Sequence, residues 1–148
     1  MLKGMQRLLT SRLGSGIPGR LSLLPALLLL LAGLFMLGGL EAVPFHPDES
    51  TYLYMSSDVD LFLQDPLAMR YDPDLPEDAR QRYRLLDAPL GRLTIGVARR
   101  LAGYAALPVD WNWQRTWEVN VAAGALPDDG LLLAGRLGTS LLGLLALV

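Results

Sequence analysis

The sequence of 148 residues contains no cysteine, a single histidine, His46, and no charged residue between positions 21 and 40. The absence of cysteine excludes a disulfide framework and thiolate metal sites. Because His46 stands alone in a proline-rich turn, a metal role for it has little support. The sequence also lacks a P-loop, a dinucleotide fingerprint and a paired His-x-x-x-His. No basic stripe interleaved with aromatic residues indicates nucleic-acid binding.

Charge is distributed unevenly along the chain. Residues 1–20 carry four basic residues and no acid, whereas residues 41–129 hold all fifteen acids beside eight arginines, a net charge of −7. The uncharged stretch between them, LSLLPALLLLLAGLFMLGGL, would reach about 30 Å as a helix, which is the thickness of the hydrocarbon layer. We therefore predict a transmembrane helix over 21–40. Since Lys and Arg near a span are retained inside, residues 1–20 are predicted to be a basic cytoplasmic tail.

The segment 41–130 is predicted to be a large extracytoplasmic loop with two amphipathic juxtamembrane helices. Apolar residues recur at spacings of three and four near 49–64, after Asp48 as a predicted N-cap. A second helix is predicted near 89–104, with proline in its first turn. Its apolar face consists of Leu90, Leu93, Val97, Leu101 and Tyr104, with Arg92 and Arg99 on the opposite face. The proline-rich, acidic stretch 65–80 between the helices is predicted to be an irregular loop.

The last part of the predicted loop and the end of the sequence both indicate contact with a membrane. Three tryptophans lie within DWNWQRTW at 110–117, as expected for side chains at headgroup level. The chain turns apolar again from Leu131, but only about 18 Å of helix would follow Arg136. Residues 131–148 are thus predicted to be the start of a second transmembrane helix. The predicted fold class is an all-α integral membrane protein with one complete transmembrane helix, as the front end of a larger polytopic protein.

Four charged residues of this region could carry chemistry, although each has a simpler structural explanation. Asp48 and Glu49 could serve only to cap a helix and complement its dipole. Arg92 could be a solvated face residue, and Arg136 could be a snorkelling anchor. Taken together, a carboxylate could accept a proton from a hydroxyl as a general base, while arginines hold the oxygens of a phosphate ester. The combination favours a reaction between an acceptor hydroxyl and a lipid phosphate ester.

The order of these features resembles the N-terminal part of the GT-C superfamily, the integral-membrane glycosyltransferases that use polyprenyl-phosphate sugars. Within it, the sequence is similar to the protein O-mannosyltransferase and aminoarabinose transferase-like group. HPDESTY at 46–52 stands in the place of the family's loop Asp-Glu motif, and DAPLGRL at 87–93 stands where the mannosyltransferases have H-P-P-L-G-K. RLGTSLLG at 136–143 resembles the opening of their second span. The resemblance covers residues 20–148.

The resemblance implies inverting transfer of a sugar from a polyprenyl phosphate to an acceptor hydroxyl on the outer face of the cell membrane. It makes Asp48 the catalytic base with Glu49 as its acidic neighbour, and Arg92 and Arg136 the contacts to the lipid phosphate. Because Arg92 replaces a lysine, and arginine binds phosphate bidentately, the donor geometry is expected to differ from the family's. The 148 residues alone are expected to be inactive, since the later spans that complete the donor pocket are not among them.

The partners implied are the polyprenyl-phosphate-linked sugar donor, a hydroxyl-bearing protein, lipid or glycan acceptor, and membrane lipid, with no nucleic acid. No cofactor is evident, and whether Asp48 and Glu49 hold a divalent cation stays open. The main alternative is a non-catalytic membrane-anchored module whose extracytoplasmic loop binds a partner. A third alternative is a soluble domain released by cleavage after about Ala42, against which the apolar end of the sequence argues.

Overall fold

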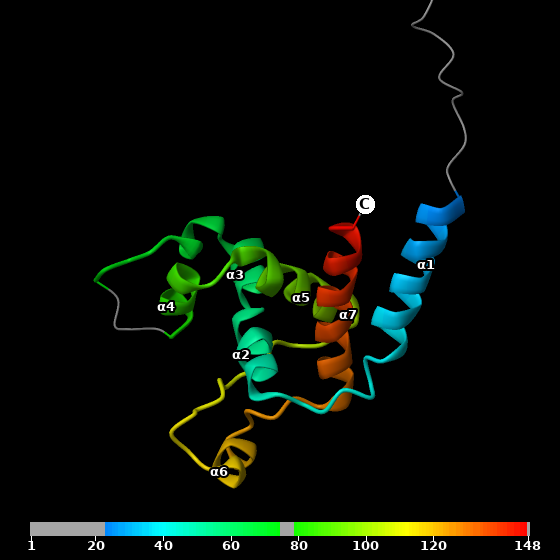
Figure 1. Ribbon diagram of the computed structural model, residues 1–148. Coiled ribbons are helices and arrows are strands. Elements are labelled where there is room, and N and C mark those ends of the chain that lie inside the picture. The colour runs from blue at the N-terminus through cyan, green and yellow to red at the C-terminus, as the bar shows by residue number, and fades with distance from the viewer. Residues whose placement is uncertain (1–22, 75–78, 148) are drawn as a thin grey trace, which may run out of the picture.

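The computed structural model describes residues 23–74 and 79–147, and within these ranges it is helical, with no strand. The elements in chain order are α1 (Leu23–Gly38), α2 (Pro47–Met55), α3 (Asp58–Gln64), the 3-10 helix η1 (Pro66–Met69), α4 (Ala79–Leu86), α5 (Pro89–Leu101), α6 (Trp117–Ala122) and α7 (Asp129–Leu145). Helices α2, α5 and α7 pack together in the centre, with α1 and α4 at opposite edges and α6 below (Figure 1).

The hydrophobic core lies where α2 packs against α5 and α7. It contains Leu53, Tyr54 and Met55 of α2, together with Ile95, Leu107 and Leu131. Glycines allow the close approach of the helices. A Cβ atom at Gly138 of α7 would lie 3.0 Å from the Thr94 carbonyl oxygen of α5, and one at Gly96 would lie 2.6 Å from the Ser56 carbonyl oxygen. Backbones at this distance leave no room for a larger residue.

Helix α5 buries the face that carries two arginines together with Ile95 and Gly96, and it exposes the opposite, apolar face. Arg99 is 1% exposed and Arg92 is also buried, whereas Leu101 is 85% exposed and Leu90 is largely exposed. The two faces predicted from the sequence are therefore present, but Arg92 is not a solvated residue. The reason is that the start of α3 supplies carboxylate partners for the buried guanidinium groups, and the turn before it supplies the Ser56 hydroxyl.

The predicted integral membrane fold is wrong for the residues that the structure describes. No helix in the described ranges combines the length and the apolar character that a membrane span requires. Helix α1 has 16 residues, or about 24 Å at the usual helical rise, so a complete transmembrane helix over 21–40 is not found. Helix α7 has 17 residues and contains Asp129 and Arg136, so it does not provide the predicted start of a second span over 131–148. The tail at 1–20 lies outside the described residues, as do residues 21, 22 and 148 of the two predicted spans.

The helix expected near 49–64 is two helices, α2 and α3, separated at Ser56 and Ser57. The Ser56 hydroxyl donates to the Leu53 carbonyl (2.6 Å), and the Ser57 hydroxyl donates to the Tyr54 carbonyl (2.9 Å). Such bonds compete with regular helical bonding and favour a break. The break turns Asp58 inward at the start of α3. Within the stretch 65–80 that was expected to be irregular, the structure forms η1, and the helix expected near 89–104 ends as α5 at Leu101.

Candidate functional site

Asp48 and Glu49 lie in the first turn of α2, in different environments. His46 is the N-cap of the helix, since its ring accepts a hydrogen bond from the Asp48 backbone N–H (3.3 Å). Glu49 accepts a bond from the His46 backbone N–H (2.8 Å) in return, which completes a capping box. The Asp48 side chain is 62% exposed, and its carboxylate lies 3.5 Å from His46 Nδ1. Of the two acids, Asp48 is the one open to a ligand.

Arg136 of α7 holds Glu49 in place. Its Nε and Nη2 donate to the two Glu49 carboxylate oxygens (2.7 and 2.9 Å). Its other N–H groups donate to the backbone carbonyls of Leu40, Val43 and Pro44. A guanidinium group has five N–H donors, so all of them are used within the chain. Contact of Arg136 with a lipid phosphate remains a prediction, and it would require that one of these bonds be replaced.

The pKa values of this pair reflect the same contact. Burial alone would raise the pKa of Glu49, but the hydrogen bonds from Arg136 and the His46 backbone, with the Arg136 charge, outweigh burial and lower it. The hydrogen bond to Glu49 raises the pKa of Arg136. Both groups are therefore charged near neutral pH, and Glu49 is a poor proton acceptor.

Arg92 belongs to a different cluster. Its Nε lies 2.9 Å from a carboxylate oxygen of Asp58 without an aligned hydrogen bond, and its Nη1 donates to the Asp87 carbonyl (3.0 Å). Arg84 of α4 binds the other oxygen of Asp58 (2.8 Å). The structure thus brings Glu49 and Arg136 together but places Arg92 against Asp58. A phosphate contact by Arg92 also remains a prediction.

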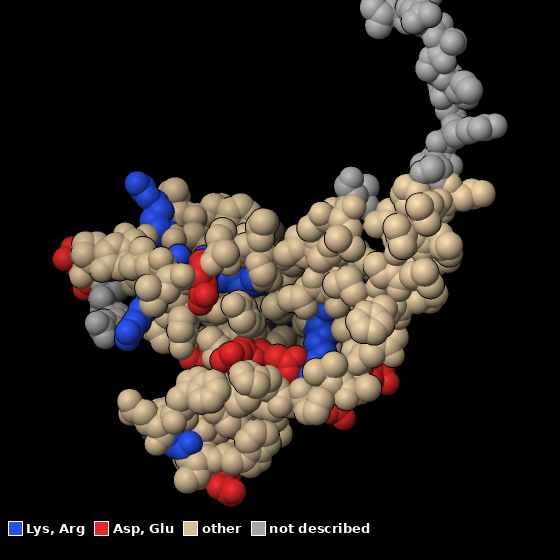
Figure 2. Space-filling model, viewed as in Figure 1, with Lys and Arg blue, Asp and Glu red and all other residues tan. Residues whose placement is uncertain are grey.

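An open hollow of about 750 Å³ lies between α4 and the segment 109–114. Its lining combines apolar, aromatic and polar side chains, from Ala79, Arg82, Tyr83, Leu86, Val109, Asp110, Trp111, Asn112, Trp113 and Gln114. Acidic side chains gather across the middle of the face drawn in Figure 2, where the surface is hollowed between the part that holds α2 to α5 and the part that holds α6. Neither Asp48 nor Arg136 lines this hollow, but α2 borders it through Thr51.

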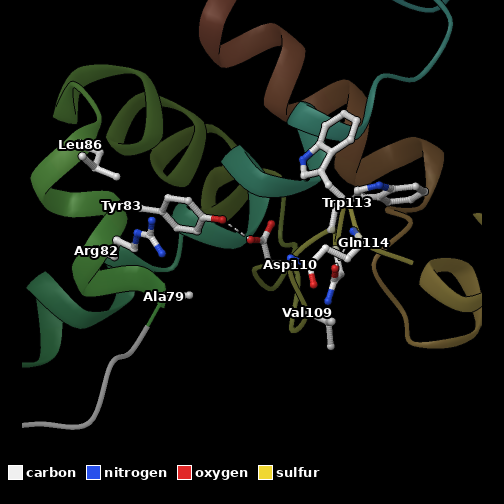
Figure 3. Close-up of a pocket in the computed structure, with 10 residues that line it drawn as sticks. Ala79, Arg82, Tyr83, Leu86, Val109, Asp110, Trp113 and Gln114 are labelled. Atoms are coloured by element: carbon white, nitrogen blue, oxygen red, sulfur yellow. Dashed lines mark hydrogen bonds between the residues drawn. The ribbon is translucent and has the colours of Figure 1, made fainter. Parts of the chain in front are cut away.

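Asp110 is held at the centre of the hollow by two hydroxyl donors. The Thr51 hydroxyl donates to one carboxylate oxygen (2.7 Å) and the Tyr83 hydroxyl to the other (2.5 Å). Figure 3 shows Tyr83 reaching from α4 to Asp110, with Trp113 and Gln114 on the far side of Asp110. Burial, the hydrogen bond to Asp110 and the charge of Asp110 raise the pKa of Tyr83 to about 12. Tyr83 is therefore a stable donor that fixes the direction of the carboxylate.

The segment 109–117 is held by buried groups, and Trp113 is the most exposed of its three indoles. Asn120 is buried and bonds to both the N–H and the carbonyl of Asn112 (2.8 and 3.0 Å). The rings of Trp111 and Trp117 lie 5.0 Å apart and both contact Phe45. Trp113, by contrast, is 63% exposed. Its ring lies 6.2 Å from that of His46, the neighbour of Asp48.

The hollow was not predicted from the sequence. The sequence predicts a headgroup anchor for the tryptophan cluster, and contact of its rings with lipid stays a prediction. The signal that was present is the alternation of aromatic and amide residues in DWNWQ at 110–114, since a ring and hydrogen-bonding groups side by side are typical of small-molecule sites. The role of Tyr83 carried no local signal, because it depends on a contact with Asp110 27 positions away.

Comparison of the chain with protein-family models, with curated proteins and with solved structures gave no match. The described residues also contain no group of three or more His, Asp or Glu side chains placed to hold a metal ion. The functional argument therefore rests on the geometry of the α2 start and of the adjacent hollow.

Proposed function

We propose that this protein takes part in glycosyl transfer from a polyprenyl-phosphate-linked sugar to an acceptor hydroxyl, with Asp48 as the general base. The observation that carries the proposal is the contrast within the acidic pair. Glu49 is bound on both oxygens by Arg136, whereas the Asp48 carboxylate is largely exposed. A general base must be within reach of its substrate, and the exposure of Asp48 supports this role.

In the proposed step, the Asp48 carboxylate accepts the proton of the acceptor hydroxyl. The acceptor oxygen attacks the anomeric carbon of the donor sugar and forms the new glycosidic bond. The bond from that carbon to the phosphate oxygen breaks, and the polyprenyl phosphate leaves with the electron pair. Attack opposite the leaving group inverts the anomeric configuration. Asp48 is protonated at the end of the step and is restored when it releases the proton to solvent.

Position and bonding argue against the neighbouring carboxylates as the base. Asp58 is buried against Arg84 and Arg92, so an acceptor could not reach it without disrupting the packing of α3 against α5. Asp110 accepts two hydroxyl donors, which suits it to orient a ligand. Among these residues, Asp48 combines exposure with freedom from an arginine partner.

The proposal is tested by the Asp48→Asn variant of the protein as it is encoded, assayed with a radiolabelled polyprenyl-phosphate sugar and membrane-extracted acceptors. Loss of a general base is expected to lower the transfer rate by about 10²–10⁴-fold, with little change in stability, because the side chain is exposed. Glu118→Gln, at an exposed acid in the first turn of α6, is the matched control and should transfer at the original rate. Full activity in Asp48→Asn would remove the proposed mechanism.

A non-catalytic interaction role is the second candidate. The observation that favours it is the apolar face of α5, where Leu90, Val97 and Leu101 are exposed in a row. Contiguous apolar surface of this kind is typical of interaction sites. Under this alternative, Asp48→Asn leaves partner binding unchanged, whereas Leu101→Ser weakens it.

A further inference from the structure

The hollow between α4 and the segment 109–114 has the chemistry of a carbohydrate subsite. We propose that it binds a pyranose ring of the acceptor, so that the acceptor is a glycan or glycolipid and not a protein side chain. The acceptor role rests on the proposed function of Asp48, whereas the binding of a sugar ring in the hollow can be measured independently of it.

The first argument is the exposed indole of Trp113. The Trp113 side chain is 63% exposed in the free protein, so a large apolar surface is in contact with water. A pyranose has an apolar C–H face that can cover such a ring, and a rim of hydroxyls that remains available for hydrogen bonds. The segment that carries Trp113 is fixed by the buried side chain of Asn120. The backbone that carries the ring is thus already ordered, which lowers the entropic cost of binding.

The second argument is the set of polar groups around the indole. Each Asp110 oxygen accepts one bond from the protein, and a carboxylate has about four acceptor positions, so positions remain for sugar hydroxyls. The Asn112 side-chain oxygen accepts from the Gln114 backbone N–H (2.9 Å), which leaves its amide N–H groups as donors. Gln114 and Arg82 also line the hollow. The hollow therefore offers both hydrogen-bond acceptors and donors beside the indole, as the vicinal hydroxyl groups of a sugar require.

The third argument is size and position. The volume of about 750 Å³ lies within the range of about 300–1,000 Å³ that small-molecule sites occupy. Two contacts connect the hollow to Asp48. The His46 ring is near both the Asp48 carboxylate (3.5 Å) and the Trp113 ring (6.2 Å between centroids). Thr51, which binds Asp110, follows Asp48 by one helical turn on the same side of α2. A sugar in the hollow would lie beside the start of α2, which carries the proposed base, and this is where an acceptor is needed.

The test measures binding in the Asp48→Asn variant, in which transfer is blocked. Saturation-transfer NMR with methyl α-mannopyranoside and methyl β-glucopyranoside reports contact with a sugar ring, and a serine-containing peptide is the comparator. We expect at least one glycoside to bind, and Trp113→Ala to weaken that binding about tenfold, the upper range for one aromatic contact. Trp113→Phe should restore part of the binding.

Arg115→Ala is the matched control, because Arg115 lies on the same segment but does not line the hollow. It should bind the glycosides as the parent does. Absence of glycoside binding, or binding that Trp113→Ala leaves unchanged, would overturn the proposal, as would tighter binding of the peptide.

Kinetics separate this proposal from that for Asp48. In the active protein, Trp113→Ala should raise KM for a glycan acceptor about tenfold with kcat nearly unchanged, the pattern for loss of uniform binding. Asp48→Asn should lower kcat instead. If glycoside binding depends on Trp113 but Asp48→Asn leaves the transfer rate unchanged, the sugar site is retained and Asp48 is rejected as the base. Loss of kcat in Asp48→Asn without any glycoside binding would do the reverse.

Discussion

Asp58 and Asp110 are both held by two partners, but the partners differ in kind. Asp58 is 2% exposed and contacts the guanidinium groups of Arg84 and Arg92. Asp110 is half-buried in an open hollow and accepts bonds from the hydroxyls of Thr51 and Tyr83. Removal of water from a carboxylate requires compensating charge, whereas an accessible carboxylate needs only orientation. The comparison separates a carboxylate that holds the fold from one that can meet a ligand.

The same distinction applies to the predicted site residues. Glu49 and Arg136 form a charged pair that ties the segment after α1 to α2 and α7, as Asp58 and its arginines tie α3 to α4 and α5. Asp48 resembles Asp110 in that neither contacts an arginine in the described residues. The carboxylates paired with arginine are thus part of the framework that positions the more accessible ones.

Asp58→Ala should have the largest effect on stability. It leaves Arg84 and Arg92 without their carboxylate partner, and breaking a buried pair in this way costs about 3–5 kcal/mol. The free energy of unfolding from urea titration, followed by far-ultraviolet circular dichroism, measures the loss.

Asp110→Asn provides the comparison. The amide oxygen can still accept one of the two hydroxyl donors, so the expected loss is about 1 kcal/mol, typical of a single hydrogen bond. Glycoside binding should fall in this variant, because an NH2 donor replaces one of the two acceptor oxygens. Equal losses of stability in Asp58→Ala and Asp110→Asn would contradict the distinction between the two carboxylates.

The pH dependence of stability should show a smaller effect from Glu49. Its pKa in the folded protein is lowered from the ordinary value of 4.5, so the folded state binds fewer protons than the unfolded state in that range. The stabilisation is complete above the unfolded pKa and is lost as the pH falls through the folded pKa. Asp60 contributes in the same direction. Burial alone would raise the pKa of Asp60, but hydrogen bonds from Arg100 and Arg99 outweigh burial and lower it.

Glu49→Gln isolates the contribution of Glu49. The difference in unfolding free energy between the parent and this variant should shrink as the pH falls from about 7 to about 3. If the difference stayed constant over that interval, the ion pair with Arg136 would not be stabilising the folded state.

Local features of the fold could be predicted from the sequence. Proline in the first turn of α5 and Glu49 in the first turn of α2 both follow from rules about helix termini, and both are confirmed. The cap itself differs, because His46 occupies the N-cap position that was assigned to Asp48. A histidine ring can accept the same backbone bond as a carboxylate, and residue preference alone does not distinguish them.

The tertiary contacts could not be predicted, because they join residues that are distant in sequence. The Thr51 bond to Asp110 spans 59 positions, and the Arg136 bond to Glu49 spans 87. Hydrophobic periodicity in α5 correctly identified two faces but not which one is buried. That choice depends on Asp58, Asp60 and Ser56, which reach α5 only because the chain turns after α2. The uncharged stretch over 21–40 favours a complete span by composition, but composition does not show that α1 ends at Gly38 and has 16 residues in the described part of the chain.

The most direct test of the division between structural and accessible carboxylates is the rate at which each is amidated. Carbodiimide with glycine ethyl ester near neutral pH, followed by peptide mass spectrometry, measures this rate for Asp48, Glu49 and Asp58 in one experiment. We predict that Asp48 reacts first, that Glu49 and Asp58 react only as the protein unfolds, and that transfer activity falls in step with the modification of Asp48. Amidation of Asp58 as fast as Asp48, or loss of transfer before Asp48 is modified, would contradict the account.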